Sequence, residues 1–262
     1  MKVRYLKILF IGAVLCLACT TKVSEWVLLN ETPENYVLVY FHKRALTAEE
    51  IQQNAKLEQE LDGANVVFKT MERREIEKPY YALLYNNRIV SDFENYKALQ
   101  DLAVSPIRNK IASELKGGKL CVLLYLKSGN NKKDEVGLET INNTLKSSLF
   151  GNIISVVELN RNSVDESLLV SMLLSIESDL KEIHEPMLFG VFGCFRALEP
   201  LLAKGISEGN INLMLDFLTA DCSCLIKDNL PGRNMLYSGK WEDSQPALVN
   251  AIIDSNPQLL HH

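Results

Sequence analysis

A proline-led hairpin pattern occurs twice in this sequence and constrains the fold more than any other feature. In the first copy Pro79 opens the run Tyr-Tyr-Ala-Leu-Leu-Tyr, Asn86 and Asn87 form a two-residue reversal, and Arg-Ile-Val begins the return. Such a reversal between two apolar runs is typical of a tight antiparallel hairpin. A similar sequence follows Pro186, where Met-Leu-Phe-Gly-Val-Phe precedes Gly-Cys-Phe and then Arg-Ala-Leu. The sequence therefore predicts a tandem repeat.

The segments around the first hairpin predict an ordered set of elements. Residues 36–41 form a short apolar run that is typical of a buried strand. Thr47 and Glu50 form a capping box that starts a helix, and residues 65–69 predict a second strand. A further helix begins after Ser105 with proline at its first position. We therefore expect strand, helix, strand, hairpin and closing helix.

The same order begins again after this closing helix. The second set of predicted elements comprises a strand over 119–126, a helix ending near Gly151, a strand over 152–157, a helix that a capping box of Ser163 and Glu166 opens and that runs to Ile183, the second hairpin, and a last helix capped by Asn210. Two α/β units of similar order are therefore expected.

Charge excludes some partners. The chain has 28 basic and 33 acidic residues and a net charge of −5, so its overall field does not favour nucleic acid. The basic pairs Arg73-Arg74 and Lys132-Lys133 are interpreted as solvated turns. No nucleic-acid partner is expected.

The N-terminus has the pattern of an export signal. Three basic residues precede an apolar run over 8–18, which is shorter than the roughly 20 residues that span a bilayer. The run ends in Leu-Ala-Cys19-Thr, which resembles the lipobox of bacterial lipoproteins. The resemblance implies a signal peptide over 1–18, lipidation of Cys19, a tether over 19–34, and a place in the bacterial cell envelope, periplasmic or surface-facing. Cys16 stands where that family usually has leucine, which leaves ordinary cleavage and an uncleaved anchor as alternatives.

The element order and the hairpin at 79–90 resemble the thioredoxin family. The resemblance implies an α/β fold with two thioredoxin-like domains over 35–117 and 118–227, followed by a C-terminal cap over 228–262. It also implies that Pro79 and Pro186 are cis and face the site of each domain.

The positions at which that family carries Cys-x-x-Cys contain no cysteine. They read His-Lys-Arg-Ala-Leu-Thr over 42–47 and Lys-Ser-Gly-Asn-Asn-Lys over 127–132. Dithiol exchange by the family's usual route is therefore unavailable, because that route needs a low-pKa thiol at the start of the helix. His42 follows the first strand and is interpreted as a structural residue in preference to a ligand or a base.

Three other cysteines are candidates for chemistry. Cys121 is expected to be a buried apolar residue of a strand, which leaves Cys194 in the second hairpin and Cys222 and Cys224 in a Cys-x-Cys pair. They could form a structural clamp or stay inert, act in redox chemistry, or bind copper or zinc.

Two functions follow from these observations. The first is a redox-inactive lipoprotein that binds a partner polypeptide or acts as a scaffold, is anchored to a membrane by lipid, and uses no cofactor. The alternative is a thiol-disulfide oxidoreductase or metal carrier that works through Cys222 and Cys224.

Overall fold

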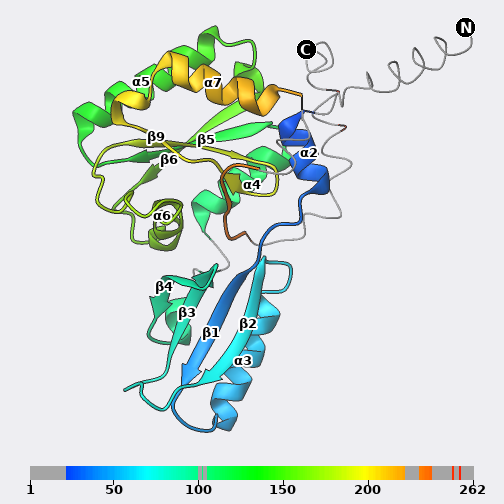
Figure 1. Cartoon of the computed structure of the whole chain (residues 1–262), viewed down its shortest axis with the longest axis vertical. Coiled ribbons are helices and arrows are strands. Elements are labelled where there is room, and N and C mark those ends of the chain that lie inside the picture. The colour runs from blue at the N-terminus through cyan, green and yellow to red at the C-terminus, as the bar shows by residue number, and fades with distance from the viewer. Residues whose placement is uncertain are drawn as a thin grey trace, which may run out of the picture.

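Two β-sheets form the framework of the molecule (Figure 1). The computed structural model describes residues 22–99, 102, 105–221 and 230–237, together with Asn250 and Asp254. The lower lobe in Figure 1 contains the first sheet and one long helix, and the upper lobe contains the second sheet and the other labelled helices. The chain is mixed α/β, in agreement with the prediction from its sequence.

The first sheet has the strand order β2-β1-β3-β4. Its elements are β1 (Tyr36–His42), α3 (Ala48–Glu60), β2 (Val66–Glu72), β3 (Tyr80–Tyr85) and β4 (Arg88–Phe93), followed by the 3-10 turn η1 (Tyr96–Leu99). β1 and β2 are parallel, and β3 is antiparallel to both β1 and β4. Asn86 and Asn87 have φ angles of 48° and 62°, as a two-residue hairpin turn requires. The first hairpin is confirmed.

The second sheet has the strand order β10-β8-β7-β5-β6, with β9 paired to β7. Its elements are β5 (Cys121–Lys127), α5 (Asn131–Ser147), η2 (Gly151–Ile153), β6 (Ile154–Asn160), α6 (Ser167–Leu174), β7 (Met187–Phe192), β8 (Arg196–Ala197), β9 (Leu201–Leu202), η3 (Ala203–Gly205), α7 (Glu208–Thr219) and β10 (Arg233–Asn234). β5 and β6 are parallel, whereas β7 is antiparallel to β5 and β8. Strands β6-β5-β7-β8 therefore repeat the order and directions of β2-β1-β3-β4, and the two hairpins hold equivalent places.

Helix α4 (Pro106–Lys116) packs against β5 and β6. The element order in the sequence places this helix at the end of the first unit, but it packs against the second sheet. Glu166 fixes its start, because its carboxylate accepts hydrogen bonds from the Ser105 hydroxyl and from the Ile107 backbone N–H, the latter at 2.8 Å. The predicted capping box of Ser163 and Glu166 is therefore wrong: Glu166 caps α4 instead of its own helix.

Residues 23–30 form helix α2 (Val23–Asn30), where the sequence predicted a tether. Val23 and Val27 are fully buried, and the Ser24 hydroxyl donates to the Leu218 carbonyl of α7 at 3.1 Å. A tether would expose these apolar side chains, whereas packing against the second lobe removes them from water. The tether is therefore wrong for this helix, and the rest of the predicted segment before Lys22 lies outside the described residues.

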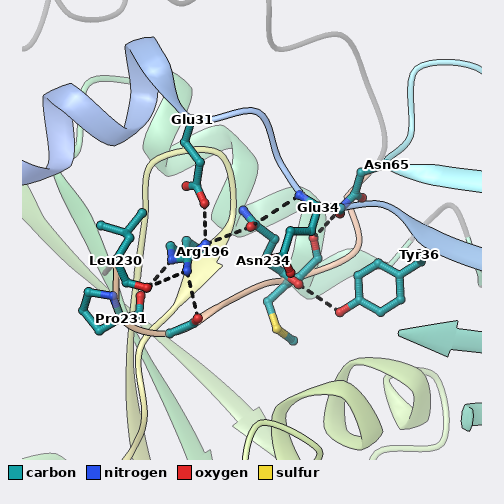
Figure 2. Close-up of polar contacts among 10 residues, drawn as sticks. Glu31, Glu34, Tyr36, Asn65, Arg196, Leu230, Pro231 and Asn234 are labelled. Carbon is teal, nitrogen blue, oxygen red and sulfur yellow. Dashed lines mark hydrogen bonds and ion pairs between the residues drawn. The ribbon is translucent and has the colours of Figure 1, made fainter. Parts of the chain in front are cut away.

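A buried polar network joins α2, the second sheet and the first sheet (Figure 2). The Arg196 guanidinium donates to Glu31, to the Asn234 side chain at 2.9 Å and to three backbone carbonyls of 230–232. The Asn234 carbonyl accepts from the Tyr36 hydroxyl of β1 at 3.0 Å. Arg196 and Asn234 lie on β8 and β10, so this network ties three parts of the chain to one another.

Candidate functional site

The two sheets offer two comparable places for a site, at the junction of β1 with α3 and at the junction of β5 with α5. In each sheet a central strand ends there and the helix that crosses to its parallel neighbour begins. Helix starts offer unpaired N–H groups, so both junctions are places where a ligand could bind.

At the first junction the polar groups are satisfied by one another. The Glu50 carboxylate accepts hydrogen bonds from the Thr47 backbone at 2.7 Å and its hydroxyl at 2.8 Å, from the Tyr40 hydroxyl at 2.9 Å, and from Arg44 at 3.1 Å. The Thr47 backbone hydrogen bond is the main cause that lowers the pKa of Glu50 to about 2. The predicted capping box is confirmed, and this junction is a closed structural cluster.

His42 belongs to the same structural cluster. Its Nδ1 lies 2.7 Å from the Arg44 carbonyl, and its ring stacks against Tyr40 with a centroid distance of 6.0 Å. Both contacts position the loop that leads into α3.

At the second junction, Asp134 holds the loop between β5 and α5 in place. Its carboxylate accepts from the Ser128 backbone and hydroxyl, both at 2.8 Å, and from the Gly129 backbone at 3.0 Å. The Tyr125 hydroxyl donates to the Asp134 carbonyl at 2.9 Å. Gly137 permits this contact, because a Cβ there would lie 2.3 Å from the tyrosine oxygen. These hydrogen bonds fix the loop that leads into α5.

A pocket of about 770 Å³ opens beside this helix start and Pro186. Its volume falls in the range of roughly 300–1,000 Å³ that is typical of ligand sites. The first two turns of α5, the Pro186 segment and the residues around η3 form its walls. The lining residues are Lys132, Lys133, Val136, Gly137, Glu185, Pro186, Leu202, Ala203, Lys204 and Ile206. Three distant stretches of sequence therefore meet at one cavity.

The pocket combines an apolar surface with positive charge. Val136 is 60% exposed, and Leu202 and Ile206 add aliphatic surface. Three lysines line the rim against one carboxylate, Glu185, which pairs with Lys133 at 2.5 Å. None of the lining residues is a cysteine, serine or histidine. This arrangement suits binding of an apolar and anionic group rather than nucleophilic chemistry.

Ala203 lies in the wall of the pocket with a φ of 42°, a conformation that alanine seldom adopts. Its backbone N–H donates to the Pro186 carbonyl at 2.9 Å. This hydrogen bond holds the η3 wall of the pocket against Pro186.

The prediction that Pro79 and Pro186 are cis is wrong. No peptide bond among the described residues is cis, and both prolines are among them. An X-Pro bond favours the trans form by about 0.5–1 kcal/mol, and the prediction rested on resemblance without a contact that would reverse this preference. Pro186 nevertheless lines the pocket, whereas Pro79 is the last residue of the loop between β2 and β3.

The cysteines fall into two groups. Cys121 is fully buried in β5, as predicted, and burial raises the pKa of its thiol, which makes it inert. Cys194 is buried in the second hairpin turn, with its Sγ 4.0 Å from the Leu28 carbonyl of α2. Cys19, Cys222 and Cys224 lie outside the described residues. The pairing or metal binding expected of the last two therefore stays a prediction.

The described part of the chain offers neither a metal-binding cluster nor a membrane-spanning helix. No cluster of three or more His, Cys, Asp or Glu side chains there could hold a metal ion. No helix there is long and apolar enough to cross a bilayer.

Comparison with solved structures gives a weak structural likeness. A structure of the first two thioredoxin domains of Naumovozyma dairenensis Eps1p is similar over 66% of this chain and 86% of that chain, with 13% sequence identity and a TM-score of 0.22. No protein-family model and no curated protein matches the sequence. A likeness at this TM-score establishes neither a fold family nor a function.

The pocket residues were not recognised from the sequence. The sequence predicts a solvated turn at Lys132-Lys133, and it gives no local signal at Val136, Lys204 or Ile206. The available signal was the basic pair at a helix start close to the position of the missing thiols. The rest of the wall depends on how η3 folds back against Pro186, which sequence spacing does not reveal.

Proposed function

We propose that this chain is an exported, lipid-anchored protein with two redox-inactive thioredoxin-like units, and that it binds a polypeptide partner through the pocket beside Pro186. The observation that carries the proposal is the composition of that pocket. It lies at the start of α5, where the family resemblance places a dithiol, yet its lining has apolar and lysine side chains and no thiol. Binding can take place there without disulfide exchange.

The repeated sheet order supports the thioredoxin-like assignment. In both sheets a parallel β-α-β unit is followed by an antiparallel hairpin. The trans prolines and the placement of α4 on the second sheet depart from the family pattern. These departures count against the assignment, which therefore rests on the repeated sheet order.

The chemistry of the pocket points to a segment with alternating apolar and acidic side chains. Val136, Leu202 and Ile206 offer contact area for apolar groups. Lys132 and Lys204 line the same cavity, and an acidic side chain would complement them. A basic segment would instead meet like charge and bind less well.

Cys19 would hold the folded body close to the membrane. Lys22, three positions after Cys19, is 2% exposed, and its ammonium pairs with Asp221 at 2.7 Å, so it belongs to the packed structure. Several acyl chains at about 0.8 kcal/mol per buried methylene give a stable anchor. A Cys19→Ala variant should move from the membrane fraction to the soluble fraction; equal recovery of both proteins with membranes would contradict the anchor.

The binding proposal is tested with two short fluorescent peptides, one of alternating leucine and glutamate and one of alternating leucine and lysine. Fluorescence anisotropy should show tighter binding of the acidic peptide, unchanged after all accessible thiols have been alkylated. The same protein should reduce insulin negligibly, because its pocket offers no attacking thiol.

Two results would contradict this function. Equal affinity for both peptides would exclude a pocket selective for acidic segments. Robust insulin reduction that is abolished by Cys222→Ser with Cys224→Ser would show instead that the Cys-x-Cys pair performs the chemistry; robust reduction that survives the double substitution would place a redox site elsewhere.

A further inference from the structure

The face of the first sheet opposite α3 carries a separate hydrophobic cluster. Val39, Phe41 and Ala82 form its buried centre. Within the described part of the chain, the hydrophobic side chains packed against it come from the same sheet or from the 73–79 segment. This face, which we call the open face, is therefore not covered by a helix from the described residues.

Large apolar side chains on the open face are exposed at its edges. Val67 and Met71 of β2 are 40% and 45% exposed, and Ile89 of β4 is 55% exposed. Strand pairing puts them on the side of Val37, Phe41 and Leu84, since paired residues point to the same side of a sheet. Such an apolar sheet face is typical of an interaction surface.

One row across the open face carries opposite charges at its two ends. Lys69 pairs with Val39, Val39 pairs with Ala82, and Ala82 pairs with Asp92. The row therefore reads positive, apolar, apolar, negative, with three strand spacings, about 14 Å, between its ends. Both charged residues are exposed, and neither has an ion-pair partner among the described residues.

A second copy of this chain supplies the pattern that complements this row. A two-fold axis parallel to the strands exchanges the two edges of the sheet and keeps each residue at its own level along the strands. Lys69 of each copy then lies opposite Asp92 of the other. Sheets stacked face to face are about 10 Å apart, a gap that lysine and aspartate side chains span together.

We infer that two copies of this chain associate through their open faces, with two symmetric ion pairs between Lys69 and Asp92. The row of Val67, Val37, Leu84 and Ile89 makes the apolar contact, because its two ends are 40% and 55% exposed, whereas Val39 and Ala82 between the charges are already buried. The 73–79 segment covers the open face near Phe41. Ile76 packs on the cluster there, and the Arg73 guanidinium lies 4.7 Å from the centre of the Phe41 ring. A contact of two rows is smaller than a standard protein interface, so the dimer is weak, with a dissociation constant in the micromolar range.

Charge reversal tests this dimer in the full chain by sedimentation over about 1 to 100 µM. Wild type should show a monomer–dimer equilibrium. Lys69→Asp and Asp92→Lys should each weaken it at least tenfold, because each places like charges opposite each other. Combining both reversals in one chain, or mixing the two single variants, should restore association. Lys110→Asp on α4 changes the same charge elsewhere and should leave it unchanged.

The restoring experiments separate the proposal from a loss of folding, since a misfolded variant would not recover on mixing. A wild-type protein that stays monomeric over this range would overturn the proposal. So would single reversals without effect, or a mixture that associates no better than its components.

Discussion

Glu31 and Arg196 form an ion pair that is buried between the end of α2 and the second sheet, with only 14% and 8% of their side chains exposed. Burial raises the pKa of Glu31 above its ordinary value, although the Arg196 charge acts in the opposite direction. The cost of removing the carboxylate from water is therefore not fully offset by its partner. The pair therefore fixes how three parts of the chain are arranged, and it contributes less to the stability of the fold.

Removal of Arg196 should be strongly destabilising. Arg196→Ala leaves Glu31 buried without its partner and deprives three backbone carbonyls of their donor, so we expect a loss of about 3–5 kcal/mol in the free energy of unfolding. Arg196→Lys should recover only part of it, because an ammonium cannot reproduce the planar fork. Urea denaturation measures both.

An exposed ion pair provides the control for this prediction. Arg74 pairs with Glu72 with 89% and 46% of their side chains exposed. Arg74→Ala should change stability by less than about 1 kcal/mol. If Arg196→Ala cost no more than this control, the network would not hold the parts together.

Much of the backbone could be predicted from local signals. The Asn86-Asn87 turn and the Thr47 cap report directly on the chain around them, and both are as expected. Hydrophobic periodicity alone predicts that Ile51 of α3 faces the core, but Ile51 is 55% exposed, whereas Asn54 is buried and accepts a hydrogen bond from Tyr81 at 2.8 Å. Periodicity cannot identify a buried polar residue whose side-chain oxygen pairs with a hydroxyl that is distant in the sequence.

Glu50 should make stability depend on pH in the acid range. Its pKa is lowered to about 2 in the folded protein, so the ionised form stabilises the fold above the ordinary value of 4.5, and this contribution is lost as pH falls towards 2. Glu50→Gln should therefore lower the free energy of unfolding by about 1 kcal/mol at neutral pH. This value allows for solvent screening, because the Glu50 side chain is 18% exposed. Near pH 2 the substitution should change the free energy of unfolding very little.

Thermal unfolding of Glu50→Gln and wild type from neutral pH to about pH 2 measures this difference. Glu58→Gln changes an exposed carboxylate on the same helix and should show no such convergence. A Glu50→Gln penalty that is constant across the range would show that the charge of Glu50 contributes nothing.

Gly137 should resist substitution although it lies inside a helix. Alanine there normally gains up to about 1 kcal/mol in helix propensity. Its Cβ would lie 2.3 Å from the Tyr125 oxygen, so Gly137→Ala should instead cost about 1–3 kcal/mol. In a Tyr125→Phe background the nearest remaining atom is 3.0 Å away, and the cost should be smaller. Equal costs in both backgrounds would exclude this clash.

The candidate site could be predicted only in part. The absence of cysteine over 127–132 and the proline before β7 direct attention to the correct end of the second sheet. The lysine and aliphatic walls come together through the placement of η3, which rests on the hydrogen bond from Ala203 to Pro186. A left-handed alanine is not a recognisable signal, and so this wall could not be inferred from the sequence.

Two matched valines give the most direct test of the account. Val136 is 60% exposed and lines the pocket, whereas Val164 is 84% exposed and does not line it. Both can be replaced by aspartate without disturbing the core. In anisotropy titrations with the leucine–glutamate peptide, Val136→Asp should weaken binding at least tenfold, about 1.4 kcal/mol, because it places negative charge in the apolar wall. Val164→Asp should bind as wild type does. Unchanged affinity for Val136→Asp, or equal losses for both variants, would contradict binding at the pocket beside Pro186.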